Sequence, residues 1–505
     1  MAIATIVLLH GWGGNSRSWG KVPQLLAEFG RVECVDLPGY GGEPELADNS
    51  LDGYLCWLEQ RLPATALVVG FSLGGMLAMA YASRHPRRVS GVLTVASNLK
   101  FVATQDWPTA LAEEQFDQFN AGYQDDPERT LARFTALACN AQREVKKQLA
   151  RDLPLPPSVS AGAAQLRLLG ELSLFSAAQG LADAALPVSQ LFAQQDALVP
   201  VAVSEQIAAL YPEFDVSYCS GSHMVPLEQP EAIVLAVEQL LLRMDRQPQL
   251  DKRAVAKGFS RAAGQYRSAA VMQAQVANDL LAEHASASAG LLLDLGCASG
   301  VQTQALQHSY PSAQQLGLDL SLGMLQVAQQ QQQATCQWLC GDAEQLPLRA
   351  GCLNTVFSSF SLQWCERVEA VASELARVAA PNGDLLLAIP VAGTLRELRA
   401  AWAEVDTDSH INRFASAARW REALEQAGFS VDQLETREYL ESHASVAALM
   451  RSIKAVGAHN SQRGRSSSAT GRGRIKQLYA AYPTAEDGSC TATWQVLFGR
   501  CKQVS

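Results

Sequence analysis

Residues 68–82, VVGFSLGGMLAMAYA, place a serine between a strand-like run and a helix-like run. The run before Gly70 is short and apolar, whereas the residues after Gly74 have the composition of a buried helix. A G-x-S-x-G turn from strand to helix is so sharp that small residues must stand two positions to either side of the serine. Such a turn lifts the Ser72 hydroxyl above the edge of a sheet, at a helix N-terminus. The stretch therefore predicts a nucleophilic serine in an α/β domain.

A nucleophilic serine needs a general base and a residue that orients the base. In the chain order Ser…Asp…His, Asp196 follows the strand-like run 188–193. His223 follows a second such run, 214–219. Because the carboxyl ends of parallel strands share one edge of a sheet, both side chains would meet Ser72 there. We predict Ser72, Asp196 and His223 as catalytic residues, against the alternative that the last two are ordinary loop residues.

Two other histidines in this part of the chain are weaker candidates for the base. His85, in SRHPRRV, has the surroundings of an exposed helix end. His10 belongs to the loop LLHGWGG, which we expect to supply backbone hydrogen-bond donors instead. The N–H groups of Trp12 and Leu73 would then form the oxyanion hole that stabilises a tetrahedral intermediate.

The same strand–helix alternation extends over residues 1–244 and predicts a mostly parallel sheet. Its strand-like runs include TIVLLHG (5–11), VECVDL (32–37), ALVVG (66–70), VSGVLTVA (89–96) and VSQLFA (188–193). Residues from about 98 to 187 interrupt the alternation with helical patterns. We expect them to form a helical lid over the C-terminal edge of the sheet.

The chain has 505 residues, which is too long for one ordinary core. A charged, proline-interrupted tract predicts a linker at 245–250. From residue 291 a second strand–helix alternation begins, and we predict a second α/β domain, with a Rossmann-like sheet, over residues 251–505.

The stretch LLDLGCASG, residues 292–300, opens this second domain with a strand and a glycine-bearing loop. The loop does not fit the G-x-G-x-x-G fingerprint of NAD-binding proteins. Asp294 at the strand end, followed by Gly296 and Gly300, fits a loop for S-adenosylmethionine (SAM) instead. Ala298 stands where that pattern has glycine, so its methyl group is expected to crowd the cofactor.

Acidic residues at the ends of the next two strand-like runs complete the pattern of a class I SAM-dependent methyltransferase. Asp319 in LGLDLS follows about 20 positions after the loop, where a carboxylate accepts both ribose hydroxyls. Asp342 and Ala343 in CGDAEQLP would face the adenine. The alternative is a packed strand end with incidental acids.

Composition limits the partners. Hydrophobic residues make up 48% and charged residues 18% of the chain, and the net charge of −10 argues against general affinity for nucleic acid or anionic membranes. The 11 cysteines show no ligand spacing, so we expect reduced thiols, no metal site and a cytoplasmic location. The start MAIATIVLLHGWGG has no basic region and its apolar run is only as long as a strand, so we expect no signal peptide, and no apolar run is long enough to predict a membrane span. The tract RGRSSSATGRGR (463–474) could bind RNA, but without interleaved aromatics a basic loop is favoured.

The first domain resembles the α/β-hydrolase superfamily in HGWGGNSRSW, DLPGYG, GFSLGG and GSHMVPLEQP. More narrowly, it is similar to the pimeloyl-acyl-carrier-protein methyl ester carboxylesterase family of biotin synthesis. The resemblance implies lid helices at 128–154 and a substrate contact at Phe134. Arg129 and Arg133, four apart on one helical face, would then steer an acidic acyl carrier protein. The basic series Arg143, Lys147 and Arg151 is a second candidate, although interleaved acids also fit a solvated helix face.

Residues 251–505 resemble the malonyl-acyl-carrier-protein O-methyltransferase family in KGFSRAAGQY (257–266), FSLQWC (360–365), GTLRELRAAWAEVD (393–406), HINRF (410–414) and MRSIKAVGA (450–458). The resemblance implies that an N-terminal segment carrying Phe259 and Tyr266 closes over SAM. A malonyl carboxylate is ionised above ~4 and needs no general base. A cation or hydrogen-bond donor should therefore hold it in line with the methyl group.

The candidates for this second substrate site are Gln363, Trp364, Arg413 and Arg451. The alternative for the two arginines is an ordinary surface position or ion pair. Together, the two resemblances imply that one half writes a methyl ester on malonyl-acyl carrier protein and the other removes it from the pimeloyl ester. The alternatives are a general carboxylesterase fused to a small-molecule methyltransferase, and a hydrolase domain that only docks carrier protein.

Overall fold

The computed structural model describes most of the chain as two compact units. Contacts between residues divide the chain into Met1–Gln247 and Pro248–Ser505. The described residues are 5–140, 145, 147, 149, 158–244, 250–285, 290–331, 336–406, 410–457 and 471–504. The linker predicted at 245–250 thus falls, except for Leu250, outside the described residues.

The first unit is built on a parallel sheet of six strands in the order β2-β1-β3-β4-β5-β6. The strands are β1 (Thr5–Leu9), β2 (Arg31–Val35), β3 (Ala66–Phe71), β4 (Val89–Val95), β5 (Val188–Ala193) and β6 (Asp215–Cys219). The four inner strands are buried along their whole length, whereas the edge strands β2 and β6 are partly exposed. Burial on both faces explains why the inner strands are continuous apolar runs in the sequence, because helices cover both faces of a parallel sheet.

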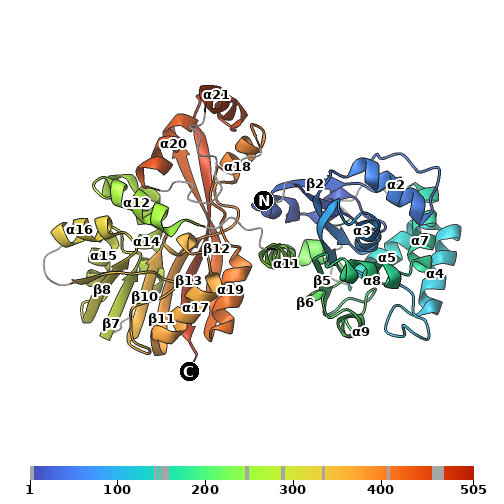
Figure 1. Ribbon diagram of the computed structural model, residues 1–505, viewed down its shortest axis with the longest axis horizontal. Coiled ribbons are helices and arrows are strands. Elements are labelled where there is room, and N and C mark those ends of the chain that lie inside the picture. The colour runs from blue at the N-terminus through green and yellow to red at the C-terminus, as the bar shows by residue number, and fades with distance from the viewer. Residues whose placement is uncertain are drawn as a thin grey trace. The chain divides into compact units, whose positions relative to one another are not determined.

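Helices follow the strands and flank the sheet (Figure 1). They are the 3₁₀ helix η1 (Ser16–Trp19) and the α-helices α1 (Val22–Leu26), α2 (Leu51–Arg61), α3 (Leu73–Arg84), α9 (Val203–Leu210), α10 (Val225–Glu228) and α11 (Pro230–Arg243). Helix α3 is buried from Leu73 to Ala82, which its small and apolar side chains permit. It therefore packs as a central helix directly after the serine turn.

The insertion between β4 and β5 is helical, as the lid prediction requires. It carries α4 (Glu113–Asp125), α5 (Pro127–Ala138), α7 (Val159–Glu171) and α8 (Phe175–Asp183). Trp12, in the loop after β1, packs edge-on against Tyr123 of α4 and Phe134 of α5, at ring-centroid distances of 5.4 and 4.7 Å. These contacts place α4 and α5 at the carboxyl end of β1. Part of the predicted lid, including Arg143 and Arg151, lies outside the described residues.

The second unit has a mixed sheet of seven strands in the order β12-β13-β11-β10-β7-β8-β9. The strands are β7 (Gly290–Leu295), β8 (Ala313–Asp319), β9 (Cys336–Cys340), β10 (Leu353–Ser359), β11 (Ala379–Pro390), β12 (Phe429–His443) and β13 (Cys490–Gln503). Strands β7 to β11 pair in parallel, and β13 runs antiparallel to both β11 and β12. Because β7 lies between β8 and β10, the strand order reverses at β7, which makes the carboxyl end of β7 a switch point where ligands bind.

Two hydrophobic cores lie on opposite faces of this sheet. Along β11, Leu386 and Ala388 belong to one core, whereas Leu385, Leu387 and Ile389 belong to the other. The alternation follows from the two-residue period of a strand. Both faces are covered by helices, so the prediction of two α/β domains, the second of them Rossmann-like, is confirmed.

The helices of the second unit include α12 (Lys252–Ala262), α13 (Tyr266–Ala269), α14 (Val271–His284), α15 (Val301–Ser309), α16 (Leu322–Gln331), α17 (Val368–Val378), α18 (Arg396–Ala403), α19 (Ala417–Gln426), α20 (Val446–Ala455), α21 (Arg472–Ala481) and the 3₁₀ turn η2 (Leu362–Trp364). Figure 1 shows α18, α20 and α21 gathered at one end of the long strands β12 and β13. Most of the basic tract 463–474 lies outside the described residues, and its last residues begin α21.

In the parts of the chain that the structure describes, no helix is long and apolar enough to cross a membrane. Within the same residues, no group of three or more His, Cys, Asp or Glu side chains is arranged to hold a metal ion.

Candidate active sites

The turn after β3 holds Ser72 in a backbone conformation that most side chains avoid, with φ 53° and ψ −119°. The backbone is fixed on both sides, because Ser72 N–H donates to Val95 O at 2.9 Å and Ser97 Oγ donates to Ser72 O at 2.8 Å. A Cβ at Gly74 would lie 2.2 Å from Leu9 O, so only glycine fits there. The pattern G-x-S-x-G thus reflects close packing of the helix start against the sheet.

Ser72, His223 and Asp196 form a continuous chain of hydrogen bonds. Ser72 Oγ lies 3.0 Å from His223 Nε2, and His223 Nδ1 lies 2.7 Å from Asp196 Oδ2. The side chains of His223 and Asp196 are 2% and 0% exposed. Their elements bring them together across 151 residues of sequence, because β3, β5 and β6 end at the same edge of the sheet.

The carboxylate of Asp196 is fixed by its own loop. Its Oδ1 atom accepts the N–H groups of Leu198 and Val199, both at 2.8 Å, which leaves Oδ2 for the histidine. The His223 ring packs against Phe71 at 5.1 Å. The arrangement suits a serine nucleophile whose proton passes to a histidine that an aspartate orients.

The loop after β1 approaches Ser72 from the other side. A Cβ at Gly11 would lie 2.9 Å from Ser72 Cβ, so the backbone before Trp12 passes close to the serine. Leu73 begins α3, and its N–H is one of the amides at a helix start that have no partner inside the helix. Both placements are compatible with the predicted oxyanion hole.

His10 has a different role from His223. It is fully buried; its Nδ1 lies 2.8 Å from Gly11 O, and Leu37 N–H donates to its Nε2 at 2.9 Å. Burial lowers the pKa of His10 to about 4, so the ring is neutral near pH 7. A neutral ring that donates from Nδ1 and accepts at Nε2 shapes the loop that carries Trp12.

A cavity opens beside the serine, lined by Trp12, Ser72, Leu131, Phe134, Leu149 and His223. Phe134 therefore lies where the resemblance implies a substrate contact. Arg129 and Arg133 are exposed on the same helix α5, on a face next to the one that buries Thr130 and Phe134. The Arg133 guanidinium donates to Gln118 Oε1 at 3.1 Å and lies 5.6 Å from the centre of the Phe119 ring.

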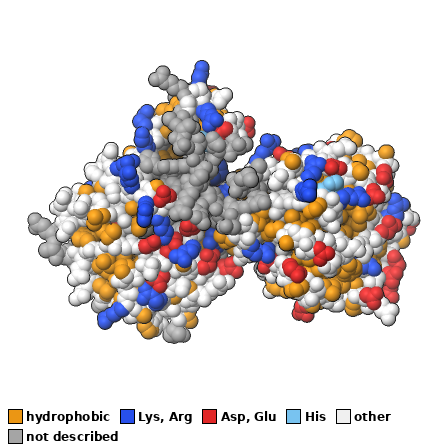
Figure 2. Space-filling view, viewed as in Figure 1, with side chains coloured by type: hydrophobic (Ala, Val, Ile, Leu, Met, Phe, Trp, Pro, Cys, Tyr) orange, Lys and Arg blue, Asp and Glu red, His pale blue; other side chains and the backbone are white. Residues whose placement is uncertain are grey.

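The neighbouring helix α4 is acidic. Its sequence EEQFDQFNAGYQD contains four carboxylates, and Figure 2 shows acidic side chains gathered at the edge of this unit where Figure 1 places α4. The lid surface is therefore mixed in charge, with arginines on α5 beside carboxylates on α4.

In the second unit, a crevice lies at the carboxyl ends of β7, β8 and β9. The strand-end crevice is lined by Lys252, Phe259, Tyr266, Asp319, Asp342 and Ala343, among others. Gly296 and Ala298 of the loop after β7 also line it. All the residues predicted for the ribose and adenine, and both aromatic residues of the N-terminal segment, therefore meet in one place.

The loop after β7 has three residues with positive φ: Gly296 (80°), Ala298 (45°) and Gly300 (78°). A Cβ at Gly296 would lie 1.9 Å from Ser361 Oγ, so glycine is required there for space as well. Ala298 adopts a conformation that favours glycine and stores a small strain. Its N–H donates to Asp319 Oδ2 at 2.9 Å, and Ser321 N–H donates to Asp319 Oδ1 at 2.7 Å.

Asp294 is buried, and Asp319, which is half-buried, lies close enough to affect its charge. Thr303 Oγ1 donates to Asp294 Oδ2 at 2.5 Å. Burial, together with the negative charge of Asp319, raises the pKa of Asp294 to about 7 against the opposing hydrogen bond from Thr303. Burial raises the pKa of Asp319 to about 6 although two backbone N–H groups favour its charged form. Both carboxylates are thus poised to gain from a ligand that donates hydrogen bonds or carries positive charge.

A second compartment adjoins the loop on the side of Asp294. Tyr266, Asp294, Ser299, Gln302 and Ser359 all line it. Ser299 Oγ, Gln302 Oε1 and Ser359 Oγ are buried polar atoms without a hydrogen-bond partner among the described residues. Buried polar atoms are normally paired, so these three fit a polar ligand. Sequence reasoning missed them, since isolated Ser and Gln residues carry no signal.

A larger aromatic cavity in the same unit is lined by Phe259, Tyr266, Gln363, Trp364, Trp402 and His410, among others. The residues Gln363 and Trp364, which the sequence predicts for the substrate site, therefore line this cavity. Arg413 and Arg451 are not among its lining residues, and Arg451 is exposed. On α20 the neighbours Met450, Ser452 and Ile453 line the cavity instead, because residue 451 falls on the outer face of the helix.

The basic side chain among the lining residues of this cavity is that of a histidine, not an arginine. His410 Nε2 lies 2.7 Å from Asp406 Oδ1, and the ring stacks on Trp402 at 3.6 Å. Asn412 lines the cavity as well. The sequence HINRF marked the segment, but only the folded loop shows that all of its residues except Arg413 line the cavity.

Family models agree with this division into two sites. A model described as alpha/beta hydrolase fold matches residues 4–230, and one described as methyltransferase domain matches residues 293–387. The chain thus combines a hydrolase and a methyltransferase.

Relatives of the same length define the family more closely. The chain is 36% identical over 493 residues to "Biotin biosynthesis bifunctional protein BioHC" of Cellvibrio japonicus, covering 95% of each chain. It is 32% identical to the protein of the same name from Teredinibacter turnerae, covering 95% of this chain and 89% of that one. The chain belongs to this family of bifunctional biotin biosynthesis proteins. Its second half is 39% identical over 251 residues to "Malonyl-[acyl-carrier protein] O-methyltransferase" of Alcanivorax borkumensis, over 49% of this chain and 85% of that one.

Proposed function

We propose that the second unit transfers a methyl group from SAM to the free carboxyl of malonyl-acyl carrier protein. We propose further that the first unit hydrolyses the methyl ester of pimeloyl-acyl carrier protein. One observation carries the proposal. A single protein of this family contains both the hydrogen-bonded residues Ser72, His223 and Asp196 and a strand-end crevice lined by acidic residues.

In the first unit, Ser72 Oγ attacks the ester carbonyl while His223 Nε2 accepts its proton. Asp196 holds the histidine in the required tautomer and stabilises its positive charge. The N–H groups of Trp12 and Leu73 stabilise the oxyanion. Methanol leaves with the proton from His223, and water, activated by the same histidine, then releases the carboxylate from Ser72.

The residues of the strand-end crevice and its neighbouring compartment fit SAM. Asp319 offers carboxylate oxygens to the ribose hydroxyls, and Asp342 lies where the adenine is expected. The unpartnered Ser299, Gln302 and Ser359 suit the polar amino-acid end. When bound, SAM supplies an electrophilic methyl group. Tyr266 lines both of these cavities and the aromatic cavity as well, which marks where cofactor and substrate meet.

The methyl acceptor is an ionised carboxylate, so this unit needs no general base. Its own residues must align the carboxylate and exclude water. Phe259 and Trp364, in edge-on contact at 5.2 Å, form an apolar wall between the strand-end crevice and the aromatic cavity. His410 and Asn412 are the polar groups that we assign to holding the carboxylate.

We propose that α5 contributes to docking of the acidic carrier protein through Arg129 and Arg133. Both arginines are exposed, whereas Phe134 on the neighbouring face of the helix is buried. Reversing their charge (Arg129→Glu with Arg133→Glu) should raise the KM for the carrier-protein ester without changing hydrolysis of a small soluble ester. A matched pair of neutral substitutions on α4, Glu114→Gln with Asp117→Asn, should leave that KM unchanged or lower it. Equal effects of both pairs would argue against docking on α5.

The fusion requires the esterase to spare the ester that the other half has just made. We expect the lid cavity to select by chain length, so that pimeloyl methyl ester is cleaved much faster than malonyl methyl ester. Mass spectrometry of both carrier proteins, incubated with the chain and SAM, tests the whole proposal. Malonyl-carrier protein should gain a methyl group and pimeloyl methyl ester should lose one. Methylation of free small acids but not of the carrier protein would favour a general methyltransferase instead.

A further inference from the structure

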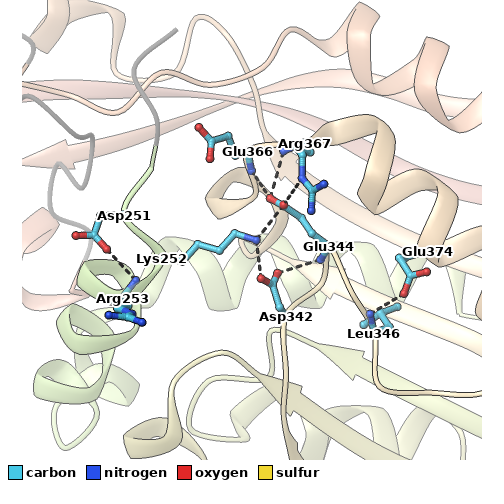
Figure 3. A network of polar contacts seen from close by, with 9 residues as sticks. All are labelled: Asp251, Lys252, Arg253, Asp342, Glu344, Leu346, Glu366, Arg367 and Glu374. Carbon is cyan, nitrogen blue, oxygen red and sulfur yellow. Dashed lines mark hydrogen bonds and ion pairs between the residues drawn. The ribbon is translucent and has the colours of Figure 1, made fainter. Parts of the chain in front are cut away.

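A network of charges joins the first turn of α12 to the edge of the strand-end crevice (Figure 3). Lys252 Nζ lies 2.6 Å from Asp342 Oδ2 and 3.0 Å from Glu344 Oε2. The side chain of Glu344 is 4% exposed, whereas those of Lys252 and Asp342 are 27% and 33% exposed. The lysine therefore spans from a partly open rim to a buried carboxylate.

Glu344 extends the network to a third segment. It accepts the N–H groups of Glu366 and Arg367 at 2.6 and 3.2 Å, and the Arg367 Nε at 3.0 Å. Although burial by itself would raise it, these hydrogen bonds and the one from Lys252 hold the pKa of Glu344 below its ordinary value. The carboxylate thus stays charged and ties α12 to the segment that follows η2.

The start of a helix is an unfavourable place for a positive charge, and the carboxylates of Asp342 and Glu344 compensate for it at Lys252. This lysine is the first residue of α12, and a cation at a helix N-terminus opposes the helix dipole. Asp251 caps the same end by accepting Arg253 N–H and Ala254 N–H. In Figure 3 the Arg253 side chain points away from the carboxylates that Lys252 contacts. The two adjacent cations therefore differ in partners although they share one helical turn.

The face of α12 that carries Lys252 is the face that lines the crevice. Lys252, Val255 and Phe259 are spaced three and four apart, and all three are lining residues. Phe259 packs against Trp364 of η2. The far half of the helix is held separately, through a 2.8 Å hydrogen bond between the hydroxyls of Ser260 and Ser321.

We propose that Lys252 is a positioning residue whose ammonium group holds the first turn of α12 on the Asp342–Glu344 turn, and so keeps Phe259 over the strand-end crevice. The inference deepens the proposed function, since it rests on the assignment of the crevice to SAM. Because SAM would lie beneath Phe259, release of the ligand requires this helix to lift. Lys252 then governs mainly how fast the ligand leaves.

The test compares Lys252→Met with the control Arg253→Met, which removes the same charge from the same turn. Dissociation of S-adenosylhomocysteine, a product of SAM-dependent methyl transfer, is measured by stopped-flow fluorescence of the full chain. Hydrogen exchange of residues 252–262 is measured in the ligand-free protein. We expect Lys252→Met to speed dissociation by about tenfold and to speed exchange in α12, as loss of one partner of a buried carboxylate implies. Lys252→Arg should restore both, and Arg253→Met should change neither.

Unchanged exchange in α12 and an unchanged dissociation rate for Lys252→Met would overturn the proposal. So would equal changes in the Arg253→Met control. The unfolding temperature of the second unit reports whether each variant is folded, ester hydrolysis reports that the first unit is intact, and Lys252→Gln replaces the methionine variant if that one unfolds. Failure of the wild-type chain to bind S-adenosylhomocysteine would instead contradict the proposed function, while exchange in the ligand-free protein would still decide the role of Lys252.

Discussion

The carboxylates of the two sites differ in the partners that surround them. In the first unit, Asp196 is fully satisfied by two backbone N–H groups and by His223. In the second unit, burial raises the pKa of Asp294 and Asp319 to about 7 and about 6, and no lysine or arginine of the described residues forms an ion pair with either. The serine site has its chemical groups in place, whereas Asp319 has two backbone N–H partners and no basic side chain, which suits the ligand that we propose for the second unit.

The largest expected effect concerns the self-contained site. Ser72→Ala should lower ester hydrolysis by about a thousandfold or more, because the nucleophile and its partners act as a unit. Methyl transfer by the second unit should stay unchanged, and an unchanged unfolding temperature of the first unit serves as the control for folding. Both rates are measured on carrier-protein substrates by mass spectrometry. Full ester hydrolysis by this variant would refute the predicted triad.

The ligand-dependent site is best probed at Asp319. Asp319→Asn keeps the shape of the side chain but removes its charge, and should weaken binding of S-adenosylhomocysteine by about ten- to a hundredfold. Isothermal titration calorimetry measures the change. Ester hydrolysis should be unaffected, and an unchanged dissociation constant would remove Asp319 from the cofactor site.

Substitutions of His410 and Arg451 compare two candidates for holding the malonyl carboxylate: the histidine that lines the aromatic cavity and an arginine that the sequence favoured. His410→Ala should raise the KM for malonyl-acyl carrier protein by about tenfold, whereas Arg451→Ala should leave it near the wild-type value. Steady-state kinetics with saturating SAM gives both numbers. A larger rise in KM for Arg451→Ala than for His410→Ala would instead support the prediction from sequence that Arg451 holds the carboxylate.

The raised pKa values make stability of the second unit depend on pH. Between about pH 4 and pH 7 the folded unit retains protons on Asp294 and Asp319 that the unfolded chain has released. Its free energy of unfolding should therefore fall as pH rises through this window. Stabilisation by S-adenosylhomocysteine should grow over the same range, because the ligand favours ionised carboxylates. Thermal unfolding at several pH values tests both trends, and Asp319→Asn should show flatter ones.

The smallest expected effect concerns the loop after β7, in which Ala298 stands where the SAM-binding pattern has glycine. Ala298→Gly should stabilise the second unit by up to about 1 kcal/mol, since positive φ costs an alanine more than the added freedom of the unfolded chain costs a glycine. Binding of S-adenosylhomocysteine should tighten slightly. Chemical denaturation followed by calorimetry separates the two effects, and a weaker affinity would show that the Ala298 methyl group supports the ligand.

Sequence patterns predicted the residues of sharp turns well, because such turns impose local steric demands. The glycines around Ser72 and the glycine at 296 are required by backbone and side-chain atoms within 3 Å of any added Cβ. The acids at the ends of β7 and β8 were predictable for a similar reason, since a parallel sheet brings its strand ends together. Arg413 and Arg451 do not line the aromatic cavity, because helix phase and loop path decide which neighbour reaches it.

By itself, the sequence determined the two fold classes and the local turns that present Ser72 and the loop after β7. Only the tertiary structure decided which distant groups meet: Lys252 with Asp342, His410 with Trp402, and the three unpaired polar atoms beside Asp294. The physical reason is the separation, along the sequence, of the residues that interact. A turn depends on the sterics of a few adjacent residues, whereas an ion pair between residues 90 positions apart depends on the order of strands and the packing of helices on them.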